Sequence, residues 1–146
     1  MEAVLFCGIQ ACGKSSFYQE KYFHTHVRIS LDQIRTRHRE RRLLAACIET
    51  QQPFVIDNTN PTVADRKRYF ELLKPTDYRV VGFYFQSKVE RCLLRNANRE
   101  TRVPDVAILA TAKRLQIPTR AEGFDALFYV KITDDGFVTE EWKDEV

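Results

Sequence analysis

The stretch that most constrains the fold of this chain is Gly8–Ser15 (GIQACGKS), which matches the pattern G-x-x-x-x-G-K-[ST]. An apolar run typical of a buried parallel strand precedes it at 3–7, and a segment with helical spacing follows it. A loop between a strand and a helix directs backbone amides and the positive end of the helix toward an anion. The stretch therefore predicts a phosphate-binding loop.

Each part of this loop has a physical role. Gly8 and Gly13 lack a Cβ, so the backbone can reach positive φ and its amides can approach an anion. Lys14 is expected to contact the β- and γ-phosphates, and Ser15 to offer its hydroxyl to Mg²⁺. The loop residues that we expect to bind a nucleotide are Gly8, Gln10, Ala11, Cys12, Gly13, Lys14, Ser15 and Ser16.

Length and composition indicate a single globular domain over residues 1–146. The chain has 44% hydrophobic and 29% charged residues, which is ordinary for a soluble protein. No apolar run approaches the roughly 20 residues of a membrane helix, and a strand at the start of the chain speaks against a signal peptide.

The four cysteines lack the spacing of a metal site or a disulfide framework, which favours the reducing cytoplasm. Cys7 and Cys92 have an apolar context and are expected to be buried, whereas Cys12 is a candidate reactive thiol.

Charge is unevenly distributed along the chain. The acidic tail, residues 133–146, has six acids and one base, a net charge of −5, which leaves +8 on the rest of a chain whose total is +3. A basic body suits a polyanionic ligand, and it is equally compatible with a solvated basic face.

Strands and helices alternate along the sequence. The expected strands are 3–7, 27–29, 53–57, 79–85 and 126–132. This order predicts an α/β fold of the P-loop type, a three-layer α/β/α sandwich with a mainly parallel five-stranded sheet. Phe137, Val138 and Trp142 in the acidic tail are suited to an additional edge strand.

An acid and a base follow the second expected strand. Ser30 and Gln33 have the spacing of a capping box, so a helix is expected to start at Ser30. Asp32 then lies in the first turn, with Arg35 one turn later on the same face. The carboxyl end of a parallel strand faces the ligand crevice, which favours a functional pair. The alternative is that Asp32 only complements the helix dipole.

The third expected strand ends in Asp57, as does a Walker-B strand whose carboxylate orders Mg²⁺ or its water, although a strand-end Asp also commonly makes a turn. Asn60 and Pro61 predict the cap and first turn of a helix that ends near Leu73, with Arg66 on its outer side.

Two groups of arginines suggest polyanion contacts. Five arginines between residues 35 and 42 could follow a nucleic-acid backbone or form a solvated run. Arg91, Arg95 and Arg99 are four residues apart, so they share one helix face. They suit a lid that closes over nucleotide phosphates, or a basic stripe that faces solvent.

Taken together, these motifs resemble those of the polynucleotide 5′-kinases, bacterial and phage end-healing enzymes that phosphorylate the 5′-OH ends of RNA or DNA. The resemblance runs from about Val4 to Val130 and rests on motifs in a fixed order: Gly8–Ser15, Asp32–Arg35 as Asp-x-x-Arg, Val55–Asn60, Arg95–Arg99 followed by Val103-Pro104, Pro118-Thr119 and Glu122–Phe124. The chain departs from this family in the short segment between Arg35 and Pro53 and in having no phosphatase or ligase module. It is either a free-standing kinase or one domain of a longer enzyme.

The resemblance implies a role for each matching position. Lys14 contacts the donor phosphates, and Ser15 binds Mg²⁺ with Asp57 ordering its water shell. Asp32 is the general base for the 5′-hydroxyl, and Arg35 holds the neighbouring acceptor phosphate. The expected lid arginines, Arg95 and Arg99, bind the donor phosphates, so the catalytic set is Asp32, Lys14 and Arg99.

Our leading hypothesis is the Mg²⁺-dependent transfer of the γ-phosphate of ATP or another nucleoside triphosphate to a 5′-OH end of RNA or DNA, without a membrane partner. A small-molecule kinase of the same fold, for a sugar, nucleoside or antibiotic, is the second hypothesis. A nucleotide-dependent binding module without phosphotransfer is the third, and an acid at the acceptor position, Asp32, speaks against it.

Overall fold

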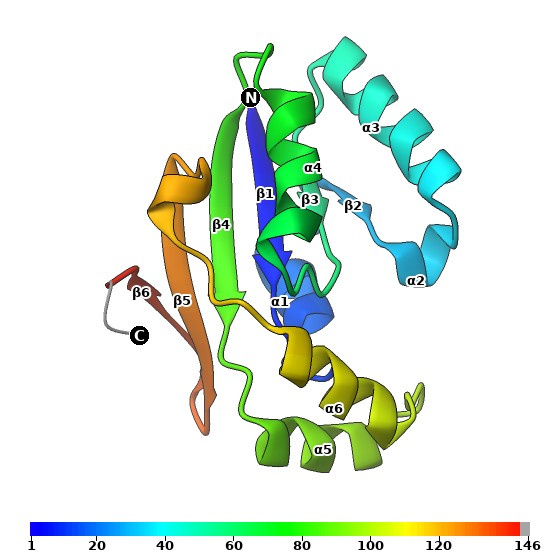
Figure 1. Cartoon of the computed structure of the whole chain (residues 1–146), viewed down its shortest axis with the longest axis vertical. Helices are drawn as coiled ribbons and strands as arrows, with labels where there is room; N and C mark the ends of the chain where they lie inside the picture. Colours follow the sequence, from blue (N-terminus) through cyan, green and yellow to red (C-terminus); the bar gives the residue numbers. More distant parts are fainter. Residues whose placement is uncertain (144–146) are drawn as a thin grey trace.

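The computed structural model describes residues 1–143, which form six strands and six α-helices (Figure 1). The strands are β1 (Glu2–Cys7), β2 (Val27–Ile29), β3 (Phe54–Ile56), β4 (Arg79–Phe85), β5 (Ala126–Thr133) and β6 (Gly136–Glu141). The helices are α1 (Lys14–Lys21), α2 (Leu31–Ile34), α3 (Arg37–Thr50), α4 (Val63–Leu73), α5 (Val89–Ala97), α6 (Asp105–Arg114) and the 3₁₀ helix η1 (Arg120–Glu122). None of these helices is long and apolar enough to cross a bilayer.

The strands form one sheet in the order β2-β3-β1-β4-β5-β6. All neighbours are parallel except β5 and β6, which form an antiparallel hairpin. The predicted α/β fold with a mainly parallel sheet is therefore confirmed. The sheet has six strands because the acidic tail supplies the edge strand β6, while Asp144 and Glu145 of that tail lie outside the described residues.

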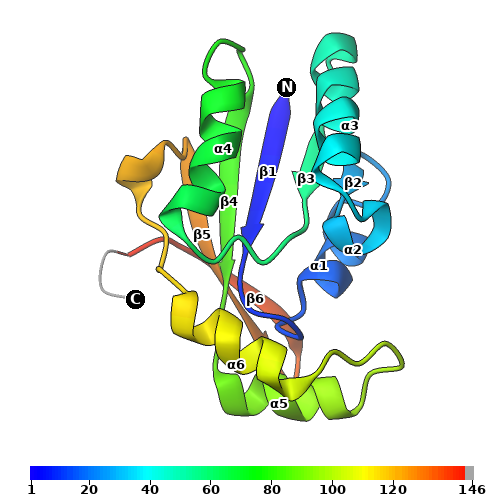
Figure 2. The same cartoon turned by 45° about the vertical axis from the view of Figure 1, so that its right-hand side comes forward.

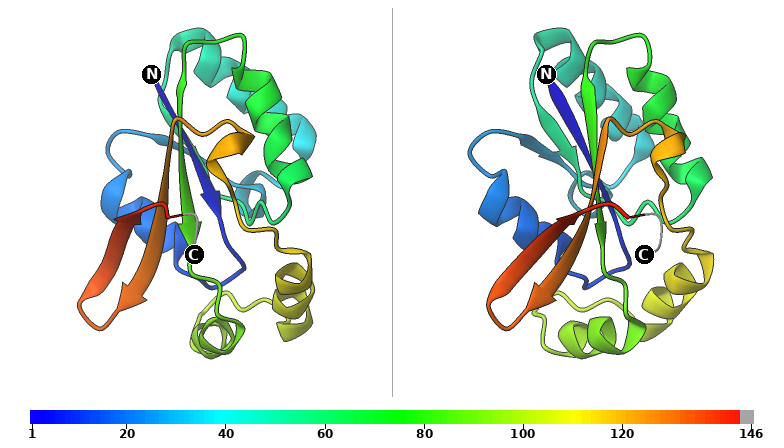
Figure 3. Two further views of the ribbon diagram at one scale, coloured as in Figure 1. Left: turned by 60° about the vertical axis from the view of Figure 1, so that its left-hand side comes forward. Right: turned by 90° about the vertical axis from the view of Figure 1, so that its left-hand side faces the viewer.

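Helices cover both faces of the sheet. Figure 3 shows α1 on one face and α3 with α4 on the other, while α5 and α6 lie beyond the carboxyl ends of the strands. Alternate residues of β1 serve the two layers, because successive strand side chains point to opposite faces. Val4 and Phe6 pack in the core on the α1 side, and Ala3 and Leu5 pack against α3 and α4.

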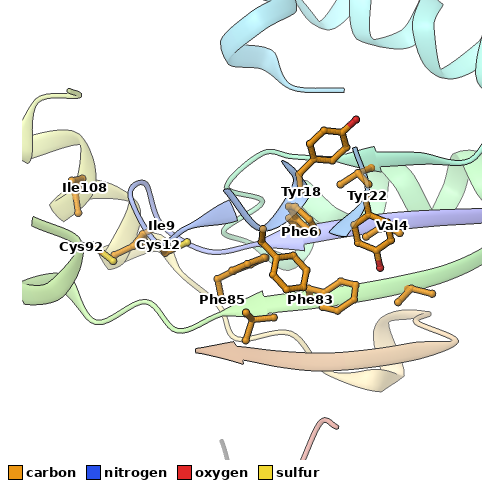
Figure 4. Close-up of a cluster of buried hydrophobic side chains, with 14 residues drawn as sticks. Val4, Phe6, Ile9, Cys12, Tyr18, Tyr22, Phe83, Phe85, Cys92 and Ile108 are labelled. Carbon is orange, nitrogen blue, oxygen red and sulfur yellow. The ribbon is translucent and has the colours of Figure 1, made fainter. Parts of the chain in front are cut away.

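Aromatic rings fill the core beneath α1 (Figure 4). The Phe6 ring centroid lies 4.9 Å from that of Phe85 and 5.8 Å from that of Phe17, both in edge-to-face geometry. Such pairs contribute about 0.5–1.5 kcal/mol beyond the area they bury. These contacts fix α1 and the loop before it on β1 and β4.

All four cysteines are free and buried, so the prediction of buried thiols at Cys7 and Cys92 is confirmed. Burial raises the pKa of Cys7 to about 12 and that of Cys92 to about 11, so both are protonated thiols at neutral pH. Cys12, the expected reactive thiol, is only 2% exposed. Its thiol is therefore shielded by the fold.

Helix α4 starts later than predicted. Its N-cap is Thr62, whose side chain accepts a hydrogen bond from the Asp65 amide in a capping box. Asn60, the predicted cap, is instead buried at a φ of 44°, and its Nδ2 donates to the Phe6 carbonyl at 2.7 Å. Asn60 therefore ties the loop after β3 to the end of β1.

Arg66, predicted to face outward from α4, is fully buried, so that prediction is wrong. Its Nε donates to Glu122 Oε1 at 2.8 Å, and its Nη1 donates to the Asn60 carbonyl at 2.8 Å. A helical pattern of charges does not reveal such a partner, because Glu122 is supplied by η1, far away in the chain. The ion pair joins α4 to the segment before β5.

We expect Arg66→Met to lower the free energy of unfolding by about 3–5 kcal/mol, because it leaves Glu122 buried without its partner. The matched control is Lys67→Met, whose ion pair with Glu71 is exposed and 3.7 Å long, and its loss is expected to be under about 1 kcal/mol. Urea denaturation of the two variants measures both. Equal losses would contradict a structural role for the buried pair.

Candidate active site

The predicted phosphate-binding loop connects β1 to α1, as expected from the sequence. Gly13 is the N-cap of α1 with a φ of 94°, a conformation that L side chains rarely adopt. Gly8 is needed for space, because a Cβ there would lie 2.7 Å from Cys12 Sγ and 3.0 Å from the Phe85 Cβ. Glycine is therefore required at the two positions for different reasons. Gly8 avoids a steric clash, and of the two only Gly13 has a positive φ.

Lys14 lies inside the loop that it is expected to serve. Its side chain is buried, and its Nζ donates to the Gly8 carbonyl at 2.9 Å and to the Ile9 carbonyl at 2.8 Å. These bonds hold the ammonium group at the amide-rich start of α1, where an anion is favoured.

A cavity of about 780 Å³ opens next to this loop and contains most of the predicted site. Ten predicted residues line it: Gln10, Ala11, Gly13, Lys14, Ser15, Ser16, Asp32, Asp57, Arg95 and Arg99. Gly8, Cys12 and Arg35 are not among the lining residues. The phosphate-binding loop and Asp32 therefore open into the same space at the carboxyl ends of the strands.

Asp32 is carried by α2, which is only one turn long. Ser30 is its N-cap as predicted, but the Ser30 side chain makes no capping bond and its buried Oγ has no hydrogen-bond partner among residues 1–143. The helix is anchored instead by Asn58, whose Oδ1 accepts from the Leu31 amide at 2.9 Å. A residue after β3 therefore positions Asp32.

Arg35 does not share a helix face with Asp32, so this part of the prediction is wrong. The helix ends at Ile34, and Arg35 is exposed at a φ of 74°. Arg37, at the start of α3, lines the cavity with Asp32 instead. The role of Arg35 in holding an acceptor phosphate stays a prediction, and the structure adds Arg37 as a second candidate.

A buried polar network supports the anchor of Asp32. The Tyr69 hydroxyl donates to Glu40 Oε2 at 2.9 Å, and Arg37 Nη1 donates to Glu40 Oε1 at 2.8 Å. Asn58 Nδ2 completes the network by donating to Glu40 Oε2 at 3.2 Å. Burial, with the nearby Glu40 carboxylate, raises the pKa of Tyr69 to about 12, which keeps its hydroxyl protonated as a donor.

The two predicted metal residues are in direct contact. The Ser15 hydroxyl donates to Asp57 Oδ2 at 3.0 Å. Hydroxyl and carboxylate oxygens fit Mg²⁺, which binds proteins through few side chains and keeps several waters or substrate phosphates. Arg28 is not among the predicted site residues, yet its Nε donates to Asp57 Oδ2 at 2.8 Å and its Nη2 donates to Ser15 Oγ at 3.1 Å. A cationic residue in the middle of a three-residue strand was the only signal available.

Helix α5, which carries the predicted lid arginine Arg95, borders the cavity on the other side together with α6. Arg95 Nη1 donates to the Ala11 carbonyl at 3.3 Å, and Arg95 and Arg99 both line the cavity, whereas Arg91 does not. Arg99 lies beyond α5, which ends at Ala97. In Figure 4 Cys92 and Ile108 of these helices lie beside Ile9 and Cys12 of the loop, in one buried cluster.

Comparison with known proteins is consistent with this geometry. Residues 4–118 match the model of the family described as AAA domain. A bifunctional polynucleotide phosphatase/kinase from Schizosaccharomyces pombe is 26% identical over 129 residues, which cover 84% of this chain and 32% of that protein. The chain thus spans about a third of the length of this curated relative.

Solved structures confirm the fold. Kti12 from Chaetomium thermophilum, in complex with ADP-AlF3, superposes with a TM-score of 0.72 at 14% identity, covering 91% of this chain and 90% of that one. A gluconokinase from Sinorhizobium meliloti 1021 gives a TM-score of 0.64 at 16% identity, covering 91% of this chain and 83% of that one. These similarities place the chain among proteins with the P-loop kinase fold.

We expect Gly13→Ala to weaken binding of a nucleoside triphosphate at least about tenfold, equivalent to about 1.4 kcal/mol. The new Cβ would lie 2.7 Å from Ile132 Cδ1 and force a φ of 94° on an L residue, so the loop has to change shape. Gly136→Ala is the matched control, since its φ is 107° but nothing lies within 4 Å. Calorimetric titration with an ATP analogue measures both, and equal affinities would contradict the predicted role of Gly13.

Proposed function

Because the chain belongs to the AAA domain family and has a P-loop kinase-type domain, we propose that it transfers the γ-phosphate of ATP or another nucleoside triphosphate to the 5′-hydroxyl end of RNA or DNA. The observation that carries this proposal is that Asp32 lines the same cavity as Lys14 and Ser15. An in-line transfer needs a base for the acceptor hydroxyl on one side of a phosphorus atom and donor-phosphate contacts on the other.

Asp32 acts on the acceptor in this proposal. The 5′-oxygen forms a bond to the γ-phosphorus while the bond from that phosphorus to the β–γ bridging oxygen breaks, and a nucleoside diphosphate leaves. The hydroxyl proton passes to a carboxylate oxygen of Asp32. The exposed position of Asp32 at the cavity allows a large acceptor to reach it.

The donor is held by cationic side chains and backbone amides. Lys14 contacts the β- and γ-phosphates from within the loop, and Arg95 and Arg99 bind them from the predicted lid. Ser15 and Asp57 would hold Mg²⁺, which neutralises charge on the phosphates when it is bound. Arg28 holds Ser15 and Asp57 in contact with each other and adds a positive charge at this edge.

Two observations favour a polynucleotide as the acceptor. The relative from Schizosaccharomyces pombe is a polynucleotide phosphatase/kinase, and its similarity covers 84% of this chain. The second observation is that Arg37 lines the cavity with Asp32, and that Arg35 lies at the end of α2, the helix that carries Asp32. Guanidinium groups next to the reacting hydroxyl suit the phosphate that joins the first two nucleotides.

Transfer of label from γ-labelled ATP to a 5′-OH oligonucleotide tests the proposal. We expect Asp32→Asn to lower kcat by about 10²–10⁴-fold, because the amide cannot accept the proton, while the KM for ATP stays similar. Asp77→Asn is the matched control, as an exposed carboxylate that does not line the cavity.

Several outcomes would count against this function. No label on RNA or DNA with any divalent metal would exclude polynucleotide 5′-kinase activity. Full activity of Asp32→Asn would remove its assignment as the base. Transfer to a sugar or nucleoside, with no competition by oligonucleotides, would favour a small-molecule kinase instead.

A further inference from the structure

A second cavity, of about 480 Å³, runs between α3 and α4. Both helices begin near the carboxyl end of the sheet and extend side by side over the same face (Figure 2). The apolar part of its wall comes from Leu44 of α3 and from Ala64, Tyr69 and Leu72 of α4. Leu72 is 41% exposed, so part of this apolar surface is open to solvent. We call this cavity the α3–α4 groove.

The charges of the α3–α4 groove are predominantly positive. Four bases and two acids line it: Arg37, Arg41, Lys67, Arg68, Glu40 and Glu71. Glu40 is buried and engaged by Arg37, and Glu71 lies 3.7 Å from Lys67. Within residues 1–143, Arg41 and Arg68 are exposed and form no salt bridge. Two guanidinium groups, one on each helix, are thus available to an anionic ligand.

The α3–α4 groove and the candidate active site share one lining residue. Arg37 lines both cavities, and it is the first residue of α3, next to the helix that carries Asp32. A polynucleotide whose 5′ nucleotide is bound at Asp32 would reach the groove by passing over Arg37. A small acceptor, by contrast, would fill only the cavity at Asp32.

We propose that the α3–α4 groove binds the single strand that follows the 5′ nucleotide of the acceptor, with Arg41 and Arg68 on its phosphates and the apolar wall beneath its bases. This inference rests on the proposed function and adds an extended binding site to it. Single strands are commonly bound in this way, by a basic groove along the backbone and apolar contacts to the bases. An arginine on each side of the groove, Arg41 of α3 and Arg68 of α4, complements the repeating negative charge of a single-stranded nucleic acid.

The test is the KM for acceptors of increasing length, from a nucleoside 3′-monophosphate to an octanucleotide. In the unaltered protein we expect KM to fall with length. In Arg41→Glu/Arg68→Glu we expect the octanucleotide KM to rise about tenfold or more, while kcat and the KM of the nucleoside 3′-monophosphate stay unchanged. The salt dependence of octanucleotide binding, followed by fluorescence anisotropy, should also lose roughly 1.4 in its logarithmic slope, because two phosphate contacts are removed.

The matched control is Arg42→Glu/Lys74→Glu. This double variant changes the net charge by the same amount. Arg42 of α3 and Lys74 at the end of α4 are both exposed, and neither lines the groove. An equal effect of both double variants would overturn the inference, because the effect would then come from net charge alone.

The remaining outcomes separate this inference from the function beneath it. If the unaltered protein phosphorylates nucleic-acid ends with a KM independent of length, the groove assignment fails and the proposed function stands. If it phosphorylates no nucleic acid, both fail. Inhibition by poly-glutamate as strong as by an oligonucleotide, without a length effect, would indicate an acidic protein partner and also overturn the assignment.

Discussion

The structure depends on the parallel pairing of β3 with β1 on one side and β2 on the other. Beyond the last paired residues, the Asp57 amide still donates to the Ile29 carbonyl at 2.9 Å, so the two chain segments leave the sheet together. Parallel strands deliver their carboxyl ends to the same edge of a sheet. The phosphate-binding loop, Asp32 and Asp57 meet at one cavity for this reason.

Pairing of strands brings the segments together, but polar contacts decide how they are oriented. A one-turn helix such as α2 is not stable by itself, because nucleation costs more than a single turn returns. Asn58 anchors α2, and Asn58 is itself oriented by hydrogen bonds to Glu40 of α3 and Tyr69 of α4. The candidate base is therefore positioned by side chains from α3 and α4, the same helices that form the α3–α4 groove.

Sequence patterns correctly predicted the features that depend only on residues close together in the chain. The apolar run before Gly8 and the helix after Gly13 identified the phosphate-binding loop, and the alternation of elements identified the α/β fold. Prediction failed where a partner comes from elsewhere in the chain. The charge pattern of α4 places Arg66 on the surface because its partner Glu122 is distant in sequence, and nothing near Arg28 in the sequence indicates its contacts with Ser15 and Asp57.

The sequence by itself determined the alternation of strands and helices, the position of the phosphate-binding loop and the chemical types available at the site, because each follows from a residue and its immediate neighbours. Only the tertiary structure decided that Arg37 rather than Arg35 lines the cavity, since α2 ends at Ile34 and the chain turns there. It also decided which charges are buried in pairs and which are free to meet a ligand. Burial and ion pairing depend on the packing of distant segments, and no local pattern records that packing.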